Sequence, residues 1–488
     1  MEDNVVIEEL GEGGFTRREL VKRTAAAGVG LSALGGLTVE AASAKSGGLD
    51  VVRWVSPRGT LEVMDDYNLV VPIKLGYFRR LGIDAKLNGG QGANEMQLIA
   101  AKQLDMGYAS PGVMTAAIDA GVPVISVWEQ FYEQVLDFVL PGDSKITHPR
   151  QLKGKTISLF TIGWKPIVDP MLGEVGVDPK TVKYREFGPQ WVQAVALKLV
   201  DAGLAWEGLR AQLQGMAGVF GSGFSLKFLV GREWGSKQPS NSYQVRRADL
   251  DDAKKRDIYT RFLAGVVQGF EFARVNPRAA AQITYEQYPG LQKLVAPQVA
   301  LDSMLQLASI YHAGRRKPPN LYGWHPTDPW QQYLDFIFKS GQTKKHLTLD
   351  DVLTNDLVKG ANAKADKARA RRDGKAYKLN EAFKRTAVPK GTLLSRKKER
   401  RRPAPAGRLL PEGRRAWTTR SRGTRTRTTR TASTRRSRGS PTRATGTWSS
   451  RQCPAGRSTS TSTRRLPRCA APLSGTASRR SASAGTRT

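Results

Sequence analysis

Short apolar runs alternate along the first half of the chain with loops that contain Gly or Ser and with segments of helical apolar spacing. Val51 to Val55 alternates like a strand and ends in the loop Ser56 to Thr60. Ser110 and Pro111 stand where a helix would have its N-cap and its first residue. The expected strands are Val51 to Val55, Gly82 to Leu87, Met106 to Ala109 and Val122 to Trp128, and the expected helices are Asn68 to Leu81, Asn94 to Ala101 and Val113 to Ala120.

The same order of strand, loop and helix returns after Gln151. The apolar run Thr156 to Phe160 breaks at Thr161 to Trp164 and gives way to a helical pattern, Lys165 to Glu174. Such repeats imply parallel sheets with right-handed crossovers. Further strands are expected at Val182 to Phe187, Leu204 to Trp206 and Phe228 to Val230, with a helix at Pro189 to Val200.

The pattern therefore predicts an α/β body over about residues 49–380 with two lobes. Lobe one is expected at about 49–140 together with part of the C-terminal helical region, and lobe two at about 150–250. The ordered C-terminal region is expected to be helical, with Ala361 to Lys378 as a solvated helix that adds little to the core. The helices predicted there are Asp251 to Val275, Pro277 to Tyr285 with Asn276 as its cap, Pro297 to His312 and Pro329 to Ser340.

The N-terminal segment, residues 1–44, has the order of a cleaved export signal. Arg17 and Arg18 precede the short apolar run Ala25 to Leu37, and Ala42 and Ala44 would stand at positions −3 and −1 of a cleavage site after Ala44. The paired arginines resemble the twin-arginine type of signal, and no cysteine follows to accept a lipid. We therefore expect an exported, periplasmic or extracytoplasmic protein without a lipid anchor. An amphipathic N-terminal helix on a cytosolic protein is the alternative.

The net charge of +34 is concentrated at the other end of the chain. From Arg401 to Thr488 there are 22 Arg and one acidic residue, Glu412, a net charge of +21. Bulky apolar residues are almost absent there, so residues 395–488 are predicted to be a disordered basic tail. Two explanations stay open, an arginine-rich nucleic-acid arm and a segment translated out of frame. The abundance of residues with codons rich in G and C favours the second, and nucleic acid is not expected as a partner.

The chemistry-bearing residues of the body are sparse. Both cysteines, Cys453 and Cys469, lie in the tail, which excludes thiol catalysis in the body. The histidines have neither a nucleophile nor metal-ligand spacing near them in sequence, and solvated or capping roles are expected for them. The glycine-rich turn Gly89 to Gly92 lacks the spacing of a dinucleotide fingerprint. We therefore predict no metal site, no cofactor and no enzymatic activity.

Five short motifs, taken in order, resemble the substrate-binding proteins of ABC importers for nitrate, sulfonates and taurine, a superfamily that includes thiamine-pyrimidine-precursor binding proteins. The resemblance covers about residues 49–378 and implies a two-lobed periplasmic-binding-protein fold with the ligand in the cleft. Two departures stand out: Leu199 replaces a usual glycine, and the segment Thr60 to Pro72 is longer than usual and contains Glu62, Asp65 and Asp66. The motifs are Leu152 to Ile157, Gly176 to Pro179, Leu104 to Gly107, Asp201-Ala202 before Trp206-Glu207, and Thr354 to Asp356.

The resemblance implies that loops at strand ends bind the ligand. Backbone N–H groups and hydroxyls at helix starts suit anionic oxygens, aromatic rings suit a planar or apolar portion, and Arg58 suits a carboxylate or sulfonate. Each aromatic ring has core or interlobe packing as its alternative role. The predicted ligand-binding residues are Ser56, Arg58, Thr60, Gly92, Asn94, Ser110, Tyr132, Thr161, Trp164 and Trp191.

The function that the resemblance implies is capture of a small anionic, sulfonate-like or pyrimidine-like ligand by hinge closure, for delivery to an ABC permease and its ATPase. The expected partners are that small-molecule ligand, the permease with its ATPase, and the twin-arginine export machinery. Two alternatives stay open. One is an enzyme like the thiamine-pyrimidine-precursor synthase, which would need a cysteine-rich motif and a reactive histidine, and the other is nucleic-acid binding through the tail.

Overall fold

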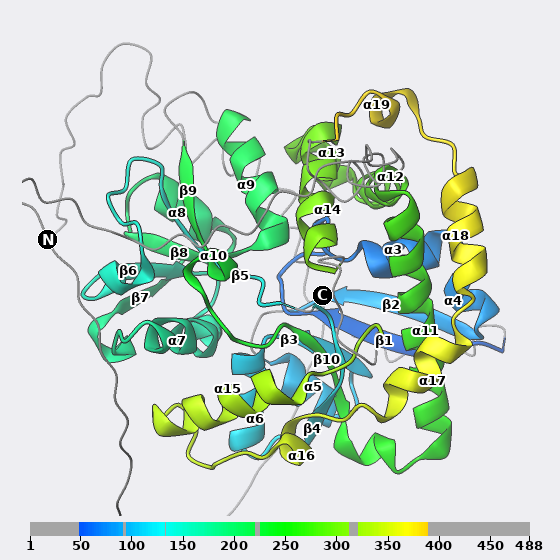
Figure 1. The fold of residues 1–488 in the computed structure, drawn as a ribbon, viewed down its shortest axis with the longest axis horizontal. Coiled ribbons are helices and arrows are strands. Elements are labelled where there is room, and N and C mark those ends of the chain that lie inside the picture. Colours follow the sequence, from blue (N-terminus) through cyan, green and yellow to red (C-terminus); the bar gives the residue numbers. More distant parts are fainter. Residues whose placement is uncertain (1–47, 91–93, 132, 220–224, 312–320, 389–488) are drawn as a thin grey trace, which may run out of the picture. The chain divides into compact units, whose positions relative to one another are not determined.

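The computed structural model describes residues 48–90, 94–131, 133–219, 225–311 and 321–388. The predicted export signal and the predicted basic tail lie outside these residues. The described body contains two five-stranded sheets, which confirms the expected two-lobed α/β architecture (Figure 1). Its helices, listed here once, are α3 (Tyr67–Lys74), α4 (Tyr77–Arg80), α5 (Glu95–Ala100), α6 (Pro111–Asp119), α7 (Lys165–Glu174), α8 (Trp191–Ala196), α9 (Glu207–Val219), α10 (Gly231–Trp234), α11 (Ala253–Val275), α12 (Pro277–Gln287), α13 (Pro289–Leu294), α14 (Pro297–Tyr311), α15 (Thr327–Lys339), α16 (Leu349–Val352), α17 (Asp356–Lys364), α18 (Lys367–Ala376) and α19 (Glu381–Lys384).

The sheet of lobe one has the strand order β2-β1-β3-β10-β4. Strand β1 lies between β2 and β3 and pairs with both in parallel, whereas β10 pairs antiparallel with β3 and β4. The sheet is therefore mixed rather than purely parallel. Its strands are β1 (Asp50–Ser56), β2 (Ile83–Gly89), β3 (Met106–Ala109), β4 (Val124–Glu129) and β10 (Ser242–Arg246).

The sheet of lobe two has the order β7-β6-β8-β5-β9. Strand β6 pairs in parallel with β7 and β8, and β5 pairs antiparallel with β8 and β9. The two lobes thus repeat one plan, in which four strands run parallel and the fourth strand in the sheet order, β10 or β5, runs antiparallel to its two neighbours. Its strands are β5 (Leu136–Pro141), β6 (Thr156–Leu159), β7 (Lys183–Glu186), β8 (Ala202–Trp206) and β9 (Leu226–Val230).

Two strands correct the lobe boundaries expected from the sequence. Strand β5 lies within residues 49–140, assigned to lobe one, but it pairs in the sheet of lobe two. Strand β10 lies within residues 150–250, assigned to lobe two, but it pairs in the sheet of lobe one. Every residue of both strands is buried, although only β5 is mainly apolar and β10 reads Ser-Tyr-Gln-Val-Arg, so the sequence of neither strand names its sheet. The chain therefore passes between the lobes twice, once before β5 and once before β10.

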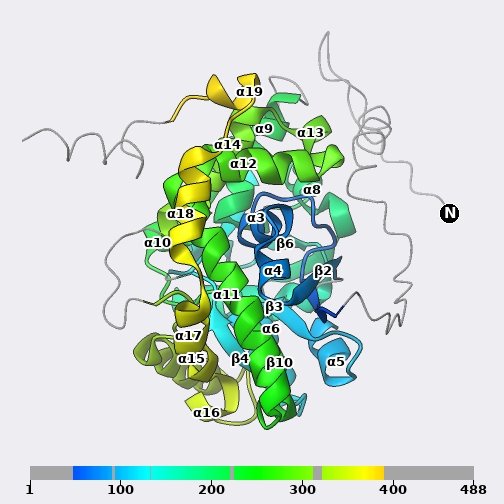
Figure 2. The same cartoon turned by 90° about the vertical axis from the view of Figure 1, so that its right-hand side faces the viewer.

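The C-terminal helices cover lobe one, with α17 and α18 running along α11 (Figures 1 and 2). Ala361 and Ala370 are fully buried, and Tyr77 donates a hydrogen bond of 2.9 Å to Asp373 of α18. Arg371 of α18 pairs with Glu271 of α11 at 2.6 Å. The expectation that residues 361–378 add little to the core is therefore wrong, because their small residues let α18 pack closely against α11.

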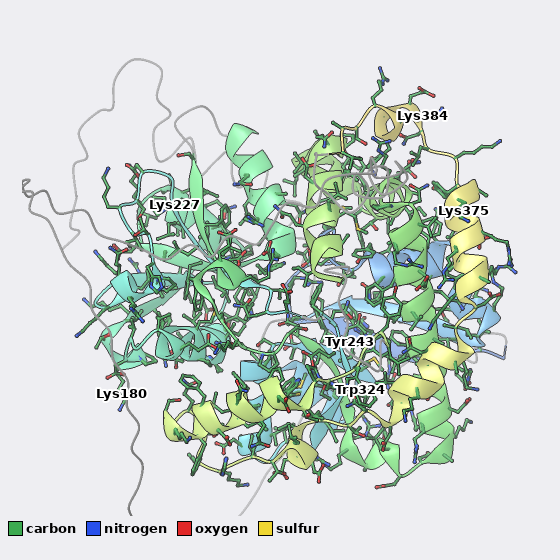
Figure 3. All side chains as sticks on the ribbon, in the orientation of Figure 1. Lys180, Lys227, Tyr243, Trp324, Lys375 and Lys384 are labelled. Atoms are coloured by element: carbon green, nitrogen blue, oxygen red, sulfur yellow. The ribbon has the colours of Figure 1, made fainter. Side chains whose placement is uncertain are left out.

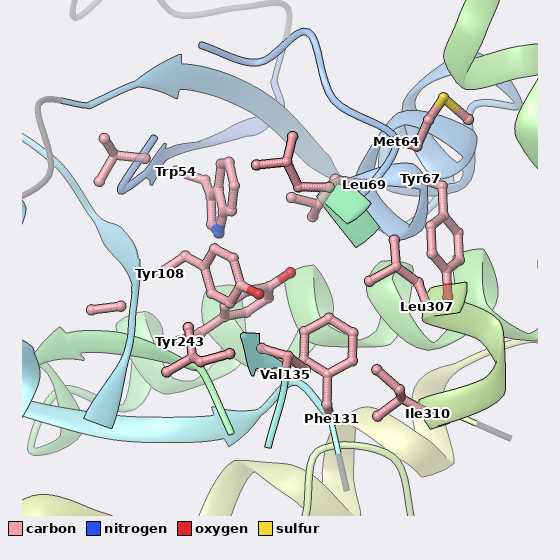
Figure 4. Packing of buried hydrophobic residues seen from close by; sticks show 14 of the residues in the cluster. Trp54, Met64, Tyr67, Leu69, Tyr108, Phe131, Val135, Tyr243, Leu307 and Ile310 are labelled. Carbon is pink, nitrogen blue, oxygen red and sulfur yellow. The ribbon is translucent and has the colours of Figure 1, made fainter. Parts of the chain in front are cut away.

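The core of lobe one is built around large aromatic side chains (Figure 4). Trp54 of β1 stacks on Tyr108 of β3 with ring centroids 5.9 Å apart and meets Tyr243 of β10 edge-on at 6.0 Å. These three residues come from adjacent strands of one sheet, so they hold β10 in its place between β3 and β4. The same cluster lies behind the cleft described below, because Tyr108 lines it.

Gly323→Ala tests the close contact between Gly323 and the Trp128 ring. Gly323 has a φ of +83°, and a Cβ there would overlap the ring, whereas Gly121 has a φ of +89° with nothing within 4 Å. We expect Gly121→Ala to lower the free energy of unfolding by about 1 kcal/mol through backbone strain alone. Gly323→Ala should lower it by about 3 kcal/mol, because overlap adds to the strain. Urea unfolding of the full chain measures both, and equal losses would contradict the packing described.

Candidate functional site

Two adjoining pockets lie between the lobes and share Arg58, Trp164 and Trp206 as lining residues. Arg58 follows β1 in lobe one, Trp164 precedes α7, and Trp206 ends β8 in lobe two. The cavity volumes are about 40 Å³ in the first pocket and about 60 Å³ in the second, so little free space is left between the two walls in this arrangement. Both lobes therefore supply walls to one cleft, called here the interlobe cleft.

A buried ion cluster forms the lobe-one wall of the cleft. Arg58 Nη1 lies 3.3 Å from Asp65 Oδ2, and Arg58 Nη2 donates to Asp66 Oδ2. Arg58 is 6% exposed, and its guanidinium carbon lies 5.6 Å from the centre of the Tyr108 ring. Burial lowers the pKa of Arg58, but Asp66 and Asp65 outweigh it, and the net direction is upward. Arg58 therefore stays charged and its charge is met by two carboxylates.

Asp65 connects the two lobes. Trp206 Nε1, on the lobe-two side, donates a hydrogen bond of 2.6 Å to Asp65 Oδ2. The other oxygen, Asp65 Oδ1, is buried and has no hydrogen-bond partner. Burial raises the pKa of Asp65 to about 6, Arg58 and Trp206 act in the opposite direction, and Asp66 adds to the rise. This carboxyl group thus lines a cleft with one oxygen unsatisfied and with a perturbed pKa, which is a mark of functional sites.

Four aromatic side chains form the lobe-two wall. The Trp164 ring lies 5.7 Å from Trp191, 6.1 Å from Trp206 and 5.4 Å from Phe160, centroid to centroid. Trp191 and Trp206 stack at 6.3 Å with an interplanar angle of 12°. Trp191 Nε1 donates to the Leu204 carbonyl oxygen at 2.9 Å, so its polar edge is satisfied inside the lobe. The wall therefore offers a ligand mainly ring faces and edges.

Five of the predicted ligand-binding residues line the cleft. They are Arg58, Thr60, Ser110, Trp164 and Trp191, distributed over the two pockets. Ser110 caps helix α6, since its Oγ accepts from Val113 N at 3.3 Å. Thr60 Oγ1 accepts from Glu62 N at 2.9 Å and thereby shapes its own loop. Whether these five residues contact a ligand stays a prediction.

The remaining predicted residues do not line either pocket or are not described. Ser56 is fully buried and its Oγ accepts from Arg58 N at 3.2 Å, so it positions the loop that carries Arg58. Thr161 Oγ1 accepts from Gly163 N at 3.3 Å as an N-cap, and Asn94 is exposed before α5. Gly92 and Tyr132 lie outside the described residues.

The residues that sequence reasoning missed are Asp65, Trp206, Tyr108 and Asn241, all of which line the first pocket. A signal existed for two of them. Asp65 belongs to the acidic insertion between Thr60 and Pro72, noted only as a departure from the family. Trp206 belongs to the quoted Asp-Ala-x-x-x-Trp motif. Neither pattern showed that the two residues meet, because 141 positions separate them in the chain.

Two crossover segments join the lobes side by side. Phe131 N donates to Ser240 Oγ at 2.8 Å, and Gln130 N donates to the Asn241 carbonyl oxygen at 2.9 Å. Glu129, at the end of β4, accepts from Ser240 N at 3.1 Å and from Trp330 Nε1 at 2.7 Å. Burial raises the pKa of Glu129 to about 8 despite these two donors. The crossovers are thus tied to lobe one at their lobe-one ends, as a hinge requires.

The lobes also touch directly through glycines. A Cβ on Gly112, at the start of α6, would overlap the Pro166 carbonyl oxygen at the start of α7. A Cβ on Gly59 would lie 2.6 Å from Phe160 Cζ. Side chains at these positions would prevent the observed approach, so the direct contact between the lobes depends on these two glycines.

The histidines need one correction. His325 is fully buried, its Nε2 lies 2.7 Å from Ser126 Oγ, and its Nδ1 lies 3.1 Å from Asn355 Oδ1. Burial lowers its pKa to about 4. It is therefore neither solvated nor a cap, and a serine hydroxyl does lie beside it. Neither Ser126 nor His325 lines the interlobe cleft. Ser126, His325 and Asn355 therefore join β4 to the segment before α15 by packing and hydrogen bonds.

The other described histidines behave as expected: His148 caps a short 3₁₀ turn by accepting from Arg150 N at 3.2 Å, and His346 is exposed. His312 lies outside the described residues. Within the described part of the chain, no group of three or more His, Cys, Asp or Glu residues has a geometry that would hold a metal ion.

The Asp65→Asn variant tests whether burial raises the pKa of the Asp65 carboxyl group. From about pH 4 to about pH 6 the folded chain retains a proton that the unfolded chain has lost, so the free energy of unfolding falls as the pH rises. The titration of Asp65 lowers the free energy of unfolding by about 3 kcal/mol across this pH range. The variant lacks that fall, and its amide oxygen still accepts from Trp206. Urea unfolding across this pH range should show its advantage over the wild type growing with pH.

The exposed Asp143 gives the matched control, since it pairs only with Lys198 at the surface. Asp143→Asn should show no such growing advantage. A constant difference between Asp65→Asn and the wild type at all pH values would contradict the raised pKa.

Comparison with known proteins gives a family match and a fold. Residues 65–280 match the family model described as NMT1/THI5 like. A search of curated protein sequences gave no match. A solved structure from Bordetella bronchiseptica RB50 superposes with a TM-score of 0.51 at 15% identity, covering 64% of this chain and 97% of that one. This likeness shows a shared fold.

Two further solved structures carry informative names. The alkanesulfonate-binding protein SsuA from Xanthomonas axonopodis pv. citri bound to MOPS gives a TM-score of 0.47 at 14% identity, covering 62% of this chain and 98% of that one. The periplasmic aliphatic sulphonate binding protein SsuA from Escherichia coli gives 0.45 at 14% identity, covering 62% and 91%. The family match over residues 65–280 confirms the resemblance expected from the sequence.

Proposed function

We propose that the chain is the extracytoplasmic solute-binding component of an ABC importer, which captures a small solute in the interlobe cleft by hinge closure. The observation that carries the proposal is the cleft itself, walled by Arg58 and Asp65 from lobe one and by Trp164 and Trp206 from lobe two. The proposed mechanism has no covalent step. The periplasmic sulfonate-binding proteins named above support it by analogy of fold.

Closure is the step that this arrangement serves. In an open state the two walls would separate, and Trp206 and Asp65 would lose their hydrogen bond. A solute that contacts both walls favours the closed state by its difference in affinity for the two states. The closed lobes would then be the surface that a permease and its ATPase recognise.

The export signal predicted from the sequence agrees with the same assignment. Within the described residues, no helix is both long enough and apolar enough to cross a bilayer. We propose that residues 1–44 direct the chain to the twin-arginine machinery and that the released protein works outside the cytoplasmic membrane without a lipid anchor. Nitrate, taurine and sulfonates stay as candidate solutes from the sequence resemblance.

Gly112→Ala tests closure. A Cβ at residue 112 overlaps Pro166 only when the lobes are together, so the variant should keep its fold and bind solute at least about tenfold more weakly. The panel is taurine, alkyl and aryl sulfonates, nitrate, thiamine-related pyrimidines and organic cations. Calorimetry gives the affinity, and small-angle scattering gives the radius of gyration with and without solute. A solute at 100 times its dissociation constant should stabilise the wild type by about 2.7 kcal/mol.

Gly360→Ala is the control, because residue 360 lies in α17 and its Cβ would meet only Thr260 Cγ2, at 3.0 Å. It should bind like the wild type. If Gly112→Ala binds solute as tightly as the wild type, and its radius of gyration decreases by the same amount on binding, closure through this contact is contradicted. If no solute of the panel binds to the wild type, the assignment of the interlobe cleft as the binding site is contradicted.

Deletion of residues 401–488 tests the tail. The interlobe cleft is built from residues between 57 and 307, so solute affinity should stay within about twofold of the full chain. Calorimetry on both proteins measures it. Loss of affinity in the deletion variant would mean that the basic tail takes part in solute binding. A frame change in the DNA near codon 395 would explain the tail independently.

A further inference from the structure

The charges that face the interlobe cleft are unequal in sign. Among the described residues that line either pocket, Arg58 is the one basic side chain, whereas Asp65 and Glu62 also line the pockets and Asp66 pairs with Arg58. Glu62 is partly compensated, since Gly290 N–H and Lys293 oppose the rise that burial causes in its pKa. The labelled lysines Lys180, Lys375 and Lys384 lie at the edges of the view in Figure 3. The cleft is thus more negative than the body as a whole.

Arg58 is poorly placed to receive an anion. Both of its terminal nitrogens already face carboxylates, at Asp65 and Asp66. The Arg58 Nε is buried and has no hydrogen-bond partner. Among the described residues that line the cleft, it is the one buried side-chain donor without a partner. An incoming anion would meet one guanidinium and two carboxylates, and like charges in a buried site repel strongly.

The unsatisfied groups of the cleft are mostly acceptors. Asp65 Oδ1, Gln212 Oε1 and Asn241 Oδ1 are buried and have no hydrogen-bond partner. An amide can rotate to present N–H instead, but a carboxylate oxygen cannot, so Asp65 carries the argument. Asp65 is 4% exposed, lines the first pocket and therefore calls for a donor supplied from outside the chain.

The opposite wall suits a positive charge as well. Trp164 lines both pockets, as does Trp206, and tryptophan gives the strongest attraction between an aromatic face and a cation. Tyr108 lines the first pocket and already lies against the Arg58 guanidinium. The cleft thus combines an under-satisfied carboxylate with aromatic rings, the two groups that recognise organic cations.

We infer that the solute of the interlobe cleft is a small planar organic cation with N–H donors, of the amidinium or guanidinium type, rather than an anion. This inference rests on the proposed solute-binding function and names its ligand class. One N–H group would donate to Asp65 Oδ1 while the planar cation lies against Trp164 or Trp206. This inference departs from the sequence-based expectation of a sulfonate or other anionic ligand, and the following test decides between the two.

The test uses three probes that share one ring and differ in charge. Benzamidinium is a planar cation with N–H donors, benzamide is its neutral counterpart, and benzoate is the anion. Calorimetry on the full chain should give benzamidinium an affinity at least about tenfold above that of benzamide, with benzoate weaker still. In Asp65→Asn the preference for benzamidinium over benzamide should disappear, whereas the control Asp143→Asn should retain it.

The outcomes separate this inference from the proposed function. Benzoate or an aryl sulfonate binding as tightly as benzamidinium overturns the inference, although closure on an anion would leave solute capture intact. Benzamidinium binding that survives in Asp65→Asn overturns the assigned contact and hence the inference. Absence of benzamidinium binding also overturns the inference. The proposed solute-binding function is contradicted as well only if no solute of the wider panel changes the stability or the scattering of the chain.

Discussion

The buried ion cluster of Arg58, Asp65 and Asp66 is the constraint on which the cleft depends. Removing charged groups from water costs several kcal/mol for each ion, and only close pairing with further hydrogen bonds offsets that cost. Asp66 of the acidic insertion pairs with Arg58 of the preceding loop in the same lobe, whereas Asp65 takes part of its compensation from Trp206 in the other lobe. The cluster therefore ties the electrostatic balance of lobe one to the position of lobe two.

The remainder of the cleft follows from this cluster and from the way the chain crosses between lobes. Because β5 and β10 exchange sheets, the lobes are joined by two neighbouring segments that hydrogen bond to each other at Phe131 and Ser240. Two neighbouring connections between lobes are the arrangement in which a few segment residues can absorb a hinge movement, by which Trp206 would approach or leave Asp65. The glycines at 59 and 112 remove the side chains that would stop this approach.

Local structure could be predicted from the sequence where one segment contains its own signals. Helix α7 begins at Lys165 and ends at Glu174 as predicted, Ser110 and Asn276 cap the helices expected of them, and β3 has its predicted bounds. Long-range partners were not predictable. A buried apolar run such as β5 suits either sheet, and the contacts of Asp65 with Trp206 and of His325 with Ser126 join positions far apart in the chain. The loops were therefore found, but the charges that meet across them were not.

The unequal charges also explain how a solute would drive closure. Bringing Trp206 against Asp65 removes water from a carboxylate that keeps one oxygen without a partner, so the empty closed state carries an unrelieved electrostatic cost. In the open state water would hydrate that oxygen. A cation with an N–H donor would satisfy it only after the lobes meet, which concentrates its favourable contacts in the closed state. A ligand shifts such an equilibrium by its difference in affinity between the two states, and an under-satisfied Asp65 makes that difference large.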